Sequence, residues 1–181
     1  MMLKLGVIGT NWITEQFIQA TKITGKYQLN TVYSRSKNKA QTIANKYHAK
    51  EIFTNLESFF SKGDFEIVCI ASPNSLHFKQ AKSAIAAGKH IIVEKPAFSS
   101  PSEMLVINNL LLKNTGLFFF EAARRIYEPN FKAVQAAVTQ LDKLQGVTLT
   151  YMKYSTRYDQ VLAGGEPNIF PLSFLVVPYR I

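Results

Sequence analysis

Cysteine is almost absent from the sequence, since Cys69 is the only one in 181 residues. A single cysteine cannot form an internal disulfide, and its place in an apolar run indicates a buried, reduced thiol. Long hydrophobic runs are absent as well, because no apolar stretch approaches the roughly 20 residues that cross a bilayer. No signal-peptide cleavage site precedes the first strand-like segment. These absences favour a cytoplasmic protein without disulfides and without a membrane partner.

Acidic residues are few: 12 Asp and Glu stand against 21 Lys and Arg, which gives a formal net charge of +9. Such an excess is typical of nucleic-acid-binding proteins. Here, however, the lysines are scattered over the expected helices and loops, with no basic run and no nucleic-acid-binding module. A solvated surface and a site for a polyanionic cofactor account for the charge. We therefore expect no nucleic-acid partner, and no metal site is expected either.

Short apolar runs alternate with longer segments of helical periodicity, which predicts β-α-β units around a parallel sheet. The expected strands are 3–9, 27–33, 51–53, 65–71, 90–93 and 117–121, and the expected helices are 11–21, 37–47, 56–61, 75–87 and 101–113. The strands are apolar nearly throughout, as strands covered on both faces must be. Residues 1–120 are therefore expected to form a doubly wound α/β domain of the Rossmann type.

The pattern changes after residue 121. Segment 128–144 has the periodicity of one long helix, and 146–156 alternates like a half-exposed strand of an antiparallel sheet. We expect residues 121–170 to be the incomplete start of an α+β substrate domain, whose sheet could join two copies of the chain. Residues 171–181 are apolar without any period and fit no element of a folded surface.

The glycine-rich signature of dinucleotide sites, G-x-G-x-x-G/A between a strand and a helix, is incomplete in segment 6–14. Gly9 can take the first position, but Asn11 stands at the second and Thr14 at the third. Asn tolerates a left-handed backbone better than most residues, and the turn directs N–H groups and the helix dipole towards an anion. The alternative is a strand-ending glycine followed by an Asn helix cap. The residues predicted to bind a cofactor here are Gly9, Thr10, Asn11, Trp12 and Ile13.

The end of the second expected strand lies about 20 residues further on, where NAD-binding sites carry a ribose-binding carboxylate. This chain has Ser34, Arg35 and Ser36 there, followed by Lys37 and Lys39. A guanidinium and hydroxyl groups bind the 2′-phosphate of NADP, which a carboxylate would repel. An ordinary polar loop with a helix cap at Ser36 is the alternative. We predict that Ser34, Arg35 and Lys39 bind the cofactor, and that NADP is preferred to NAD.

Two more buried strands end in polar residues at the edge where such sheets bind ligands, in segments 68–77 and 87–96. Lys95 follows an apolar strand directly, so we expect it to be partly desolvated. In that state it could donate a hydrogen bond to a substrate hydroxyl or carbonyl. An exposed ion pair of Glu94 with Lys95 is the alternative interpretation.

The sequence resembles the glucose–fructose oxidoreductase/inositol dehydrogenase/rhizopine catabolism (Gfo/Idh/MocA) family, from the first strand to about residue 170. The most specific match pairs Ser72-Pro73-Asn74 and His77 with Ala87-Gly88-Lys89-His90 and Glu94-Lys95-Pro96. The resemblance implies an NAD(P)-dependent oxidoreductase that moves a hydride between the nicotinamide and a sugar, cyclitol or related polyol. An Ado-Met-dependent methyltransferase suits the incomplete glycine loop but leaves Glu94-Lys95-Pro96 unexplained.

The resemblance also implies roles for individual residues. Lys95 would be catalytic, beside the nicotinamide and the reacting carbon, with Glu94 and Pro96 shaping that wall and a cis bond before Pro96. Segment 121–125 resembles the passage between the family's two domains. The further residues expected to line the cofactor cleft are Ala71, Ser72, Pro73, Asn74, His77 and Arg124.

The family continues well beyond this chain, with a mainly antiparallel sheet and an Asp-and-His motif that completes the catalytic site. Possible codons for 171–181, shifted by one nucleotide, can spell a family-like continuation, so one hypothesis is a frameshift near Pro171. A deliberately shortened chain and a natural short protein are the alternatives. We expect no turnover from the chain as it stands, and a non-catalytic NADP(H)-binding module is the competing functional hypothesis.

Overall fold

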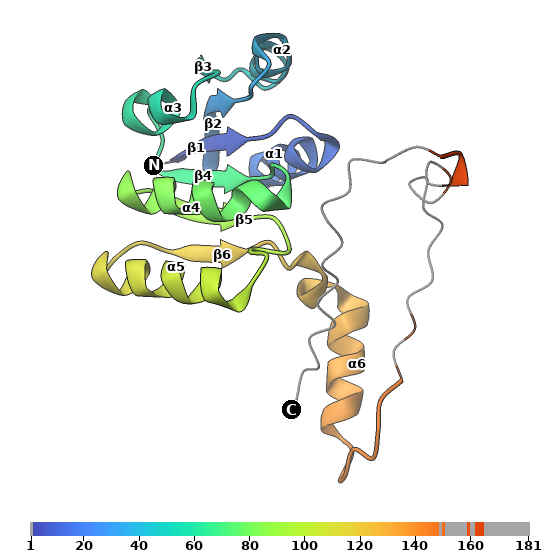
Figure 1. The fold of residues 1–181 in the computed structure, drawn as a ribbon. Coiled ribbons are helices and arrows are strands. Elements are labelled where there is room, and N and C mark those ends of the chain that lie inside the picture. Colours follow the sequence, from blue (N-terminus) through green and yellow to red (C-terminus); the bar gives the residue numbers. More distant parts are fainter. Residues whose placement is uncertain (1, 149, 151–158, 160–161, 165–181) are drawn as a thin grey trace. The chain divides into compact units, whose positions relative to one another are not determined.

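The computed structural model describes residues 2–148, 150, 159 and 162–164 (Figure 1). The chain divides into two compact units, of which the first comprises Met1–Ala123 and the second begins at Arg124. Each unit is described by itself below.

The first unit is built on a sheet of six strands in the order β3-β2-β1-β4-β5-β6, and every neighbouring pair is parallel. The strands are β1 (Leu3–Ile8), β2 (Tyr27–Tyr33), β3 (Glu51–Phe53), β4 (Ile67–Ile70), β5 (His90–Val93) and β6 (Phe119–Glu121). This order, with the chain returning from β3 to β4 beside β1, is that of a Rossmann domain, which confirms the predicted fold class. The crossover places the ends of β1 and β4 side by side and opens a crevice between their loops.

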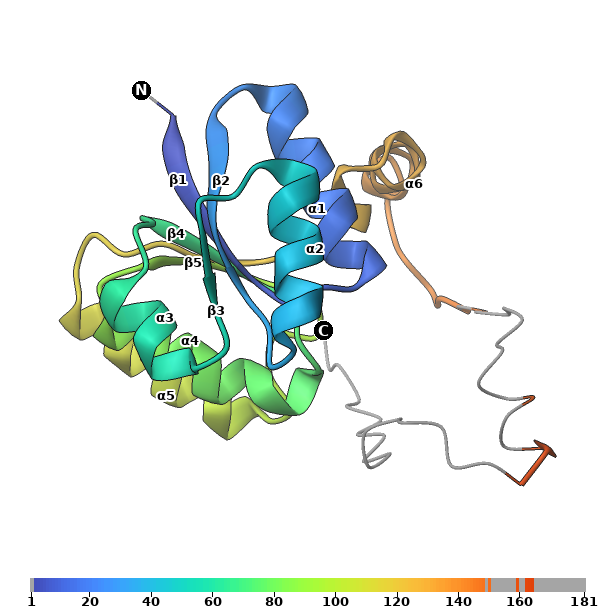
Figure 2. The ribbon, with the colours of Figure 1, turned by 90° about the horizontal axis from the view of Figure 1, so that it is seen from above.

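Helices cover both faces of this sheet. They are α1 (Trp12–Thr24), α2 (Lys37–Tyr47), α3 (Leu56–Lys62), α4 (His77–Ala86) and α5 (Pro101–Lys113), with a short 3₁₀ turn, η1 (Asn74–Leu76), before α4. Figure 2 shows α1 and α2 on one side of the strands and α3, α4 and α5 on the other. Asn and Ser caps begin several of them, since a side-chain oxygen of Asn11, Ser36, Asn55 or Ser100 accepts a hydrogen bond from the residue three positions on. The α4 helix begins two residues later than expected, because the residues after Pro73 form the 3₁₀ turn.

Each face of the sheet has its own hydrophobic core. The core between the sheet and α3, α4 and α5 contains Ile70 of β4, Ile91 of β5 and Ile107 of α5, together with an aromatic group around Phe59 of α3. Under α1 and α2 lie apolar residues of β1, β2 and β4, including Cys69, which is 2% exposed. Burial, and to a smaller extent the charge of Glu94, raises the pKa of the Cys69 thiol. The thiol is therefore buried and free, as predicted.

A small polar contact joins the two helices of one face. The carboxylate of Glu15 on α1 pairs with the ammonium group of Lys46 and accepts a hydrogen bond of 2.8 Å from the hydroxyl of Tyr47, both on α2. These two partners hold the pKa of Glu15 below its usual value.

This shift gives a pH-dependent expectation for Glu15→Gln. A carboxyl whose pKa is lower in the folded state stabilises the fold above its unfolded-state pKa, and that contribution disappears as the pH falls through the folded-state value. The variant should therefore unfold at slightly lower urea concentration than the parent at neutral pH and at the same concentration near pH 3, with the difference reduced by salt. Equal destabilisation at both pH values would contradict this account.

The second unit contains a 3₁₀ turn, η2 (Arg124–Tyr127), and the helix α6 (Pro129–Thr139). The helix ends at Thr139, so the predicted helix 128–144 is too long. The Thr139 hydroxyl donates a hydrogen bond to the carbonyl of Ala136, and the N–H groups of the next two residues bond to carbonyls only three positions back. In the predicted strand 146–156, the described residues 146–148 and 150 form no strand, and the others lie outside the described residues, as do 171–181. None of the helices in the described ranges is long and apolar enough to cross a membrane.

Candidate functional site

A cavity of about 450 Å³ opens where β1, β2 and β4 end. Its lining comes from the three loops that follow these strands and from the segment before and within α4. The lining residues are Ile8, Gly9, Thr10, Asn11, Tyr33, Ser34, Arg35, Ser36, Lys39, Ala71, Ser72, Pro73, Leu76 and Gln80. The cavity lies at the switch point of the sheet, which is where open α/β sheets bind their ligands.

Gly9 lets the first loop pass close to the end of β4. Its backbone has φ +118°, a conformation that residues with side chains rarely adopt. A Cβ atom at this position would lie 2.6 Å from the carbonyl oxygen of Ala71. The close approach therefore requires glycine, as the first position of a dinucleotide signature does.

Asn11 takes the second glycine position as a helix cap, which was the alternative interpretation of this turn. Its backbone is extended, with φ −92°, so the left-handed conformation that Asn tolerates is not used here. Its side-chain oxygen instead accepts a hydrogen bond of 3.0 Å from the N–H of Thr14, and its Nδ2 donates one of 2.9 Å to the carbonyl of Ala71. Asn11 thus caps α1 and ties the first loop to β4, while the N-terminus of a 13-residue helix faces this edge of the sheet.

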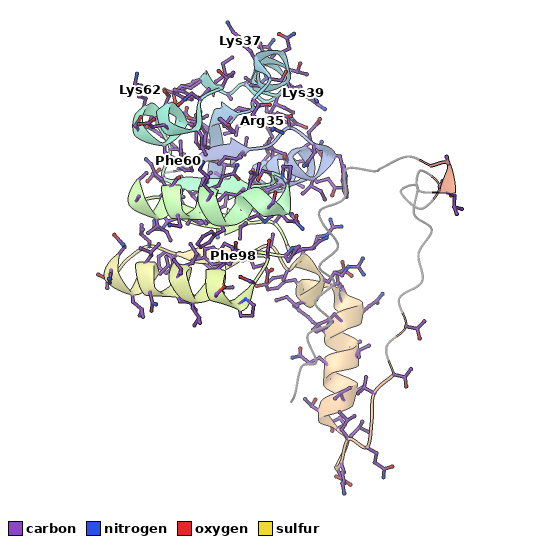
Figure 3. All side chains as sticks on the ribbon, in the orientation of Figure 1. Arg35, Lys37, Lys39, Phe60, Lys62 and Phe98 are labelled. Carbon is purple, nitrogen blue, oxygen red and sulfur yellow. The ribbon has the colours of Figure 1, made fainter. Side chains whose placement is uncertain are left out.

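The loop after β2 supplies the positive charge of the cavity. Ser36 caps α2 by accepting from the N–H of Lys39, and its own N–H donates to the Ser34 hydroxyl at 3.2 Å. Arg35 and Lys39, which Figure 3 labels, are exposed, and both line the cavity, while the first turn of α2 has no acidic residue. Among the described residues that line the cavity, no side chain carries a carboxylate.

The loop after β4 forms the opposite wall. The hydroxyl of Ser72 donates a hydrogen bond of 2.6 Å to the side-chain oxygen of Gln80, which is buried in α4. This contact fixes the Ser72-Pro73 segment against the helix, so its backbone presents a defined surface to the cavity.

The structure brings together the predicted residues of the three loops but not all the others. Gly9, Thr10, Asn11, Ser34, Arg35, Lys39, Ala71, Ser72 and Pro73 line one cavity, whereas Trp12, Ile13, Asn74, His77, Glu94, Lys95 and Pro96 do not. Lys95 is exposed in the first unit, so the expected partial desolvation is not found there. The bond before Pro96 is cis, as the resemblance implied. Arg124 begins η2 in the second unit, and its contact with a cofactor stays a prediction.

Five lining residues were not predicted. Ile8 and Tyr33 are the last residues of β1 and β2, and their apolar character is typical of core positions. Ser36 was expected only as a helix cap, and Leu76, the last residue of η1, only as part of the expected helix 75–87. Gln80 is one turn into α4, and no local sequence signal marks it. The position at the carboxyl end of a parallel strand is the signal that would have identified the first two.

Comparison with known proteins agrees with this geometry. Residues 3–121 match the family described as an oxidoreductase family with an NAD-binding Rossmann fold, Gfo/Idh/MocA. The chain is 39% identical over 173 residues to the uncharacterized oxidoreductase YgjR of Escherichia coli, covering 96% of this chain and 52% of the relative. It is 35% identical over 169 residues to the NADP(+)-dependent scyllo-inositol 2-dehydrogenase IolU of Bacillus subtilis, covering 93% of this chain and 51% of that protein.

The solved structures show the same fold. The crystal structure of scyllo-inositol dehydrogenase from Lactobacillus casei with NAD(H) and scyllo-inositol superposes with a TM-score of 0.69 at 23% identity, over 77% of this chain and 42% of that one. At this identity the likeness concerns the fold alone. The chain spans about half the length of the curated relatives it matches. From the parallel sheet, the cavity at its switch point and the match over residues 3–121, we conclude that the chain belongs to the Gfo/Idh/MocA family of oxidoreductases.

Proposed function

We propose that this chain forms the nucleotide-binding part of an oxidoreductase and binds NADP(H) in preference to NAD(H). The observation that carries the proposal is the lining of the cavity beside β2, where Arg35 and Lys39 stand and none of the described lining residues carries a carboxylate. In Rossmann domains the adenosine ribose lies at the end of the second strand, so a 2′-phosphate would meet these two cations. A guanidinium binds phosphate oxygens through paired, charge-assisted hydrogen bonds.

The pyrophosphate would lie at the Gly9–Asn11 turn, against the N-terminus of α1. Gly9 permits the close backbone approach, and Asn11 holds the turn against Ala71. Glu94, Lys95 and Pro96 follow β5, two strands from β1 across the same edge of the sheet, which is the side where the nicotinamide half would extend.

The proposed reaction is hydride exchange with a polyol or a sugar-like compound. Bound nicotinamide supplies the hydride chemistry, and the ammonium group of Lys95 would hold the oxygen on the reacting carbon by a hydrogen bond. The substrate class is supported by IolU, which is 35% identical to this chain and whose name gives scyllo-inositol. A cytoplasmic location and a homo-oligomer belong to the same proposal. A module that binds NADP(H) without turnover is the second candidate, favoured by the exposure of Lys95 and by its position outside the cavity lining.

The chain provides its own probe for cofactor binding. Trp12 is its only tryptophan, is 62% exposed, and directly follows the Asn11 cap. Reduced nicotinamide cofactors absorb in the range of tryptophan emission, so Trp12 fluorescence should fall on titration with NADPH. We expect NADPH to bind at least about 10-fold more tightly than NADH, since a charge-assisted contact to phosphate contributes about 1.5–3 kcal/mol. Equal affinities, or tighter NADH binding, would overturn the preference. Turnover with a panel of polyols, tested in the parent chain and in Lys95→Ala, separates the enzyme from the binding module.

Arg35→Gln tests the origin of the preference. The variant should bind NADPH about 10- to 100-fold more weakly and NADH almost unchanged, because it removes a charge that only the 2′-phosphate would contact. Lys37→Gln is the matched control. It removes one positive charge two positions further along the chain, and the Lys37 side chain does not line the cavity. An equal loss of NADPH and NADH affinity in Arg35→Gln would argue against a 2′-phosphate contact.

A further inference from the structure

The peptide group that follows Pro96 is held at both of its polar atoms. Its carbonyl oxygen lies 3.0 Å from Nδ1 of His77, and its N–H, which belongs to Ala97, donates a hydrogen bond of 2.8 Å to the Glu121 carboxylate. His77 begins α4 and Glu121 ends β6, so two elements distant in the sequence hold one peptide plane. This plane is one residue away from Lys95.

His77 also reaches the wall of the cofactor cavity. Its second ring nitrogen, Nε2, lies 2.9 Å from the carbonyl oxygen of Ser72, and the whole residue is 0% exposed. Both partners are acceptors, so a ring with one N–H donates to one carbonyl at a time and a ring with two donates to both. With two N–H groups the buried ring joins the loop after β4 to the loop that contains Lys95 by hydrogen bonds, and with one N–H it bonds to one of the two loops and packs against the other.

These contacts continue across the edge of the sheet. Asn11 donates a hydrogen bond to the carbonyl of Ala71. The next residue, Ser72, contacts the His77 ring through its own carbonyl oxygen, and the same ring contacts the carbonyl oxygen of Pro96. The order β1-β4-β5-β6 of the strands brings these loops next to one another (Figure 1). The phosphate turn and the loop after β5 are thereby connected through hydrogen bonds rather than through side-chain packing alone.

We propose that His77 and Glu121 are positioning residues for Lys95, and that they hold the Pro96–Ala97 peptide so that the preceding lysine keeps its place relative to the cofactor cavity. The part of this inference that concerns Lys95 rests on the proposed function. Holding both ends of one peptide dipole restricts its rotation, which restricts the backbone of the residues before it. Neither residue needs to touch the cofactor to do this.

The contact of Glu121 can be tested by amide hydrogen exchange in the whole chain, followed by NMR. Glu121 is exposed, so its variants are expected to fold. In Glu121→Ala the Ala97 N–H should exchange at least about 10-fold faster than in the parent, since it loses a charged acceptor. Glu121→Gln retains an acceptor oxygen and should restore the parent rate, whereas Glu128→Ala, which removes an exposed carboxylate elsewhere, should not alter it. An unchanged exchange rate of the Ala97 N–H in Glu121→Ala would overturn the proposal that Glu121 holds the Pro96–Ala97 peptide.

His77 is tested without substitution, because a buried variant could fail to fold. In the parent chain a slowly exchanging ring N–H of His77 should be visible, with proximity to Pro96 or to Ser72 in the same spectra. A ring without any protected N–H would overturn its part in the proposal.

The role towards Lys95 is tested with two ligands that differ only by the nicotinamide half. Glu121→Ala should weaken NADP⁺ binding several-fold and leave the binding of adenosine 2′,5′-bisphosphate unchanged, and Glu121→Gln should restore NADP⁺ binding. Equal affinities of parent and Glu121→Ala for both ligands would overturn the positioning role even if Ala97 exchange changes. A parent chain that binds neither ligand would overturn the proposed function and with it the role of Lys95. The exchange experiment would still decide whether Glu121 holds the Pro96–Ala97 peptide.

Discussion

Gly9→Ala is expected to weaken NADPH binding by at least about 100-fold, which corresponds to about 2.7 kcal/mol. The new Cβ would stand 2.6 Å from the carbonyl oxygen of Ala71, and the backbone at φ +118° disfavours any side chain. Because Ala71 lines the cavity and accepts the hydrogen bond of Asn11, relieving this overlap displaces two of the cavity walls together. Titration calorimetry with NADPH measures the loss.

Gly116→Ala is the matched control for this variant. Gly116 has φ +100°, and nothing lies within 4 Å of the place where its Cβ would stand. The substitution therefore imposes a similar backbone strain, about 1–3 kcal/mol, without an overlap and away from the cavity. It should lower the free energy of unfolding by about that amount and leave NADPH binding unchanged. If Gly9→Ala bound NADPH as Gly116→Ala does, the close approach to Ala71 would not matter for the site.

Phe59→Ala is expected to cost about 3–5 kcal/mol of unfolding free energy. Phe59 is 0% exposed, and its ring lies 4.6 Å from that of Phe65 and 5.1 Å from that of Phe60, between centroids. The rings of Tyr33 and Phe53 also pack against it. Truncation would leave a cavity among four aromatic rings. The loss is large, because the whole free energy of unfolding of a single domain is only about 5–15 kcal/mol. Urea unfolding followed by circular dichroism measures the change.

Phe118→Ala serves as the comparison for Phe59→Ala. Phe118 is 59% exposed and precedes β6, so removing its ring takes away little buried area. The loss should stay within about 0.5 kcal/mol. Similar losses for Phe59 and Phe118 would contradict the assignment of the α3-side core. A loss in Phe59→Ala could also reach the cofactor site, because Tyr33 contributes both to this aromatic group and to the cavity.

The Rossmann unit was predictable because its signals are local and repeated. Most strands are largely apolar, and α1, α2, α3 and α5 follow an Asn or Ser cap, so these elements follow from residues close together in the chain. The second unit was less predictable. The apolar spacing of Val138, Leu141 and Leu144 favours a longer helix, whereas the structure ends it at Thr139, whose hydroxyl competes for backbone carbonyls. A half-exposed strand needs a partner, and the described residues of this unit provide none.

The site was predictable where a loop follows a strand and less so where two loops meet. Arg35 and Lys39 stand in one short segment, so their shared position follows from the sequence. The contact of His77 with Pro96 spans 19 residues, and that of Ala97 with Glu121 spans 24. Such contacts depend on strand order, which no local pattern encodes. The cofactor contacts of all the predicted site residues, including those that line the cavity, and the catalytic role of Lys95 stay predictions.

The rate at which the buried cysteine of β4 can be chemically modified depends on how often the domain opens. Cys69 lies in a central strand, between β1 and β5, and burial keeps its thiol protonated and out of reach of alkylating reagents. A thiol in this state reacts only while the strand is transiently out of the sheet, so its modification rate follows the opening of the domain centre. A ligand that binds the closed sheet slows that rate in proportion to its occupancy. Alkylation of this single cysteine can therefore report how often the Rossmann unit opens, in the presence or absence of a nucleotide, without any substitution in the chain.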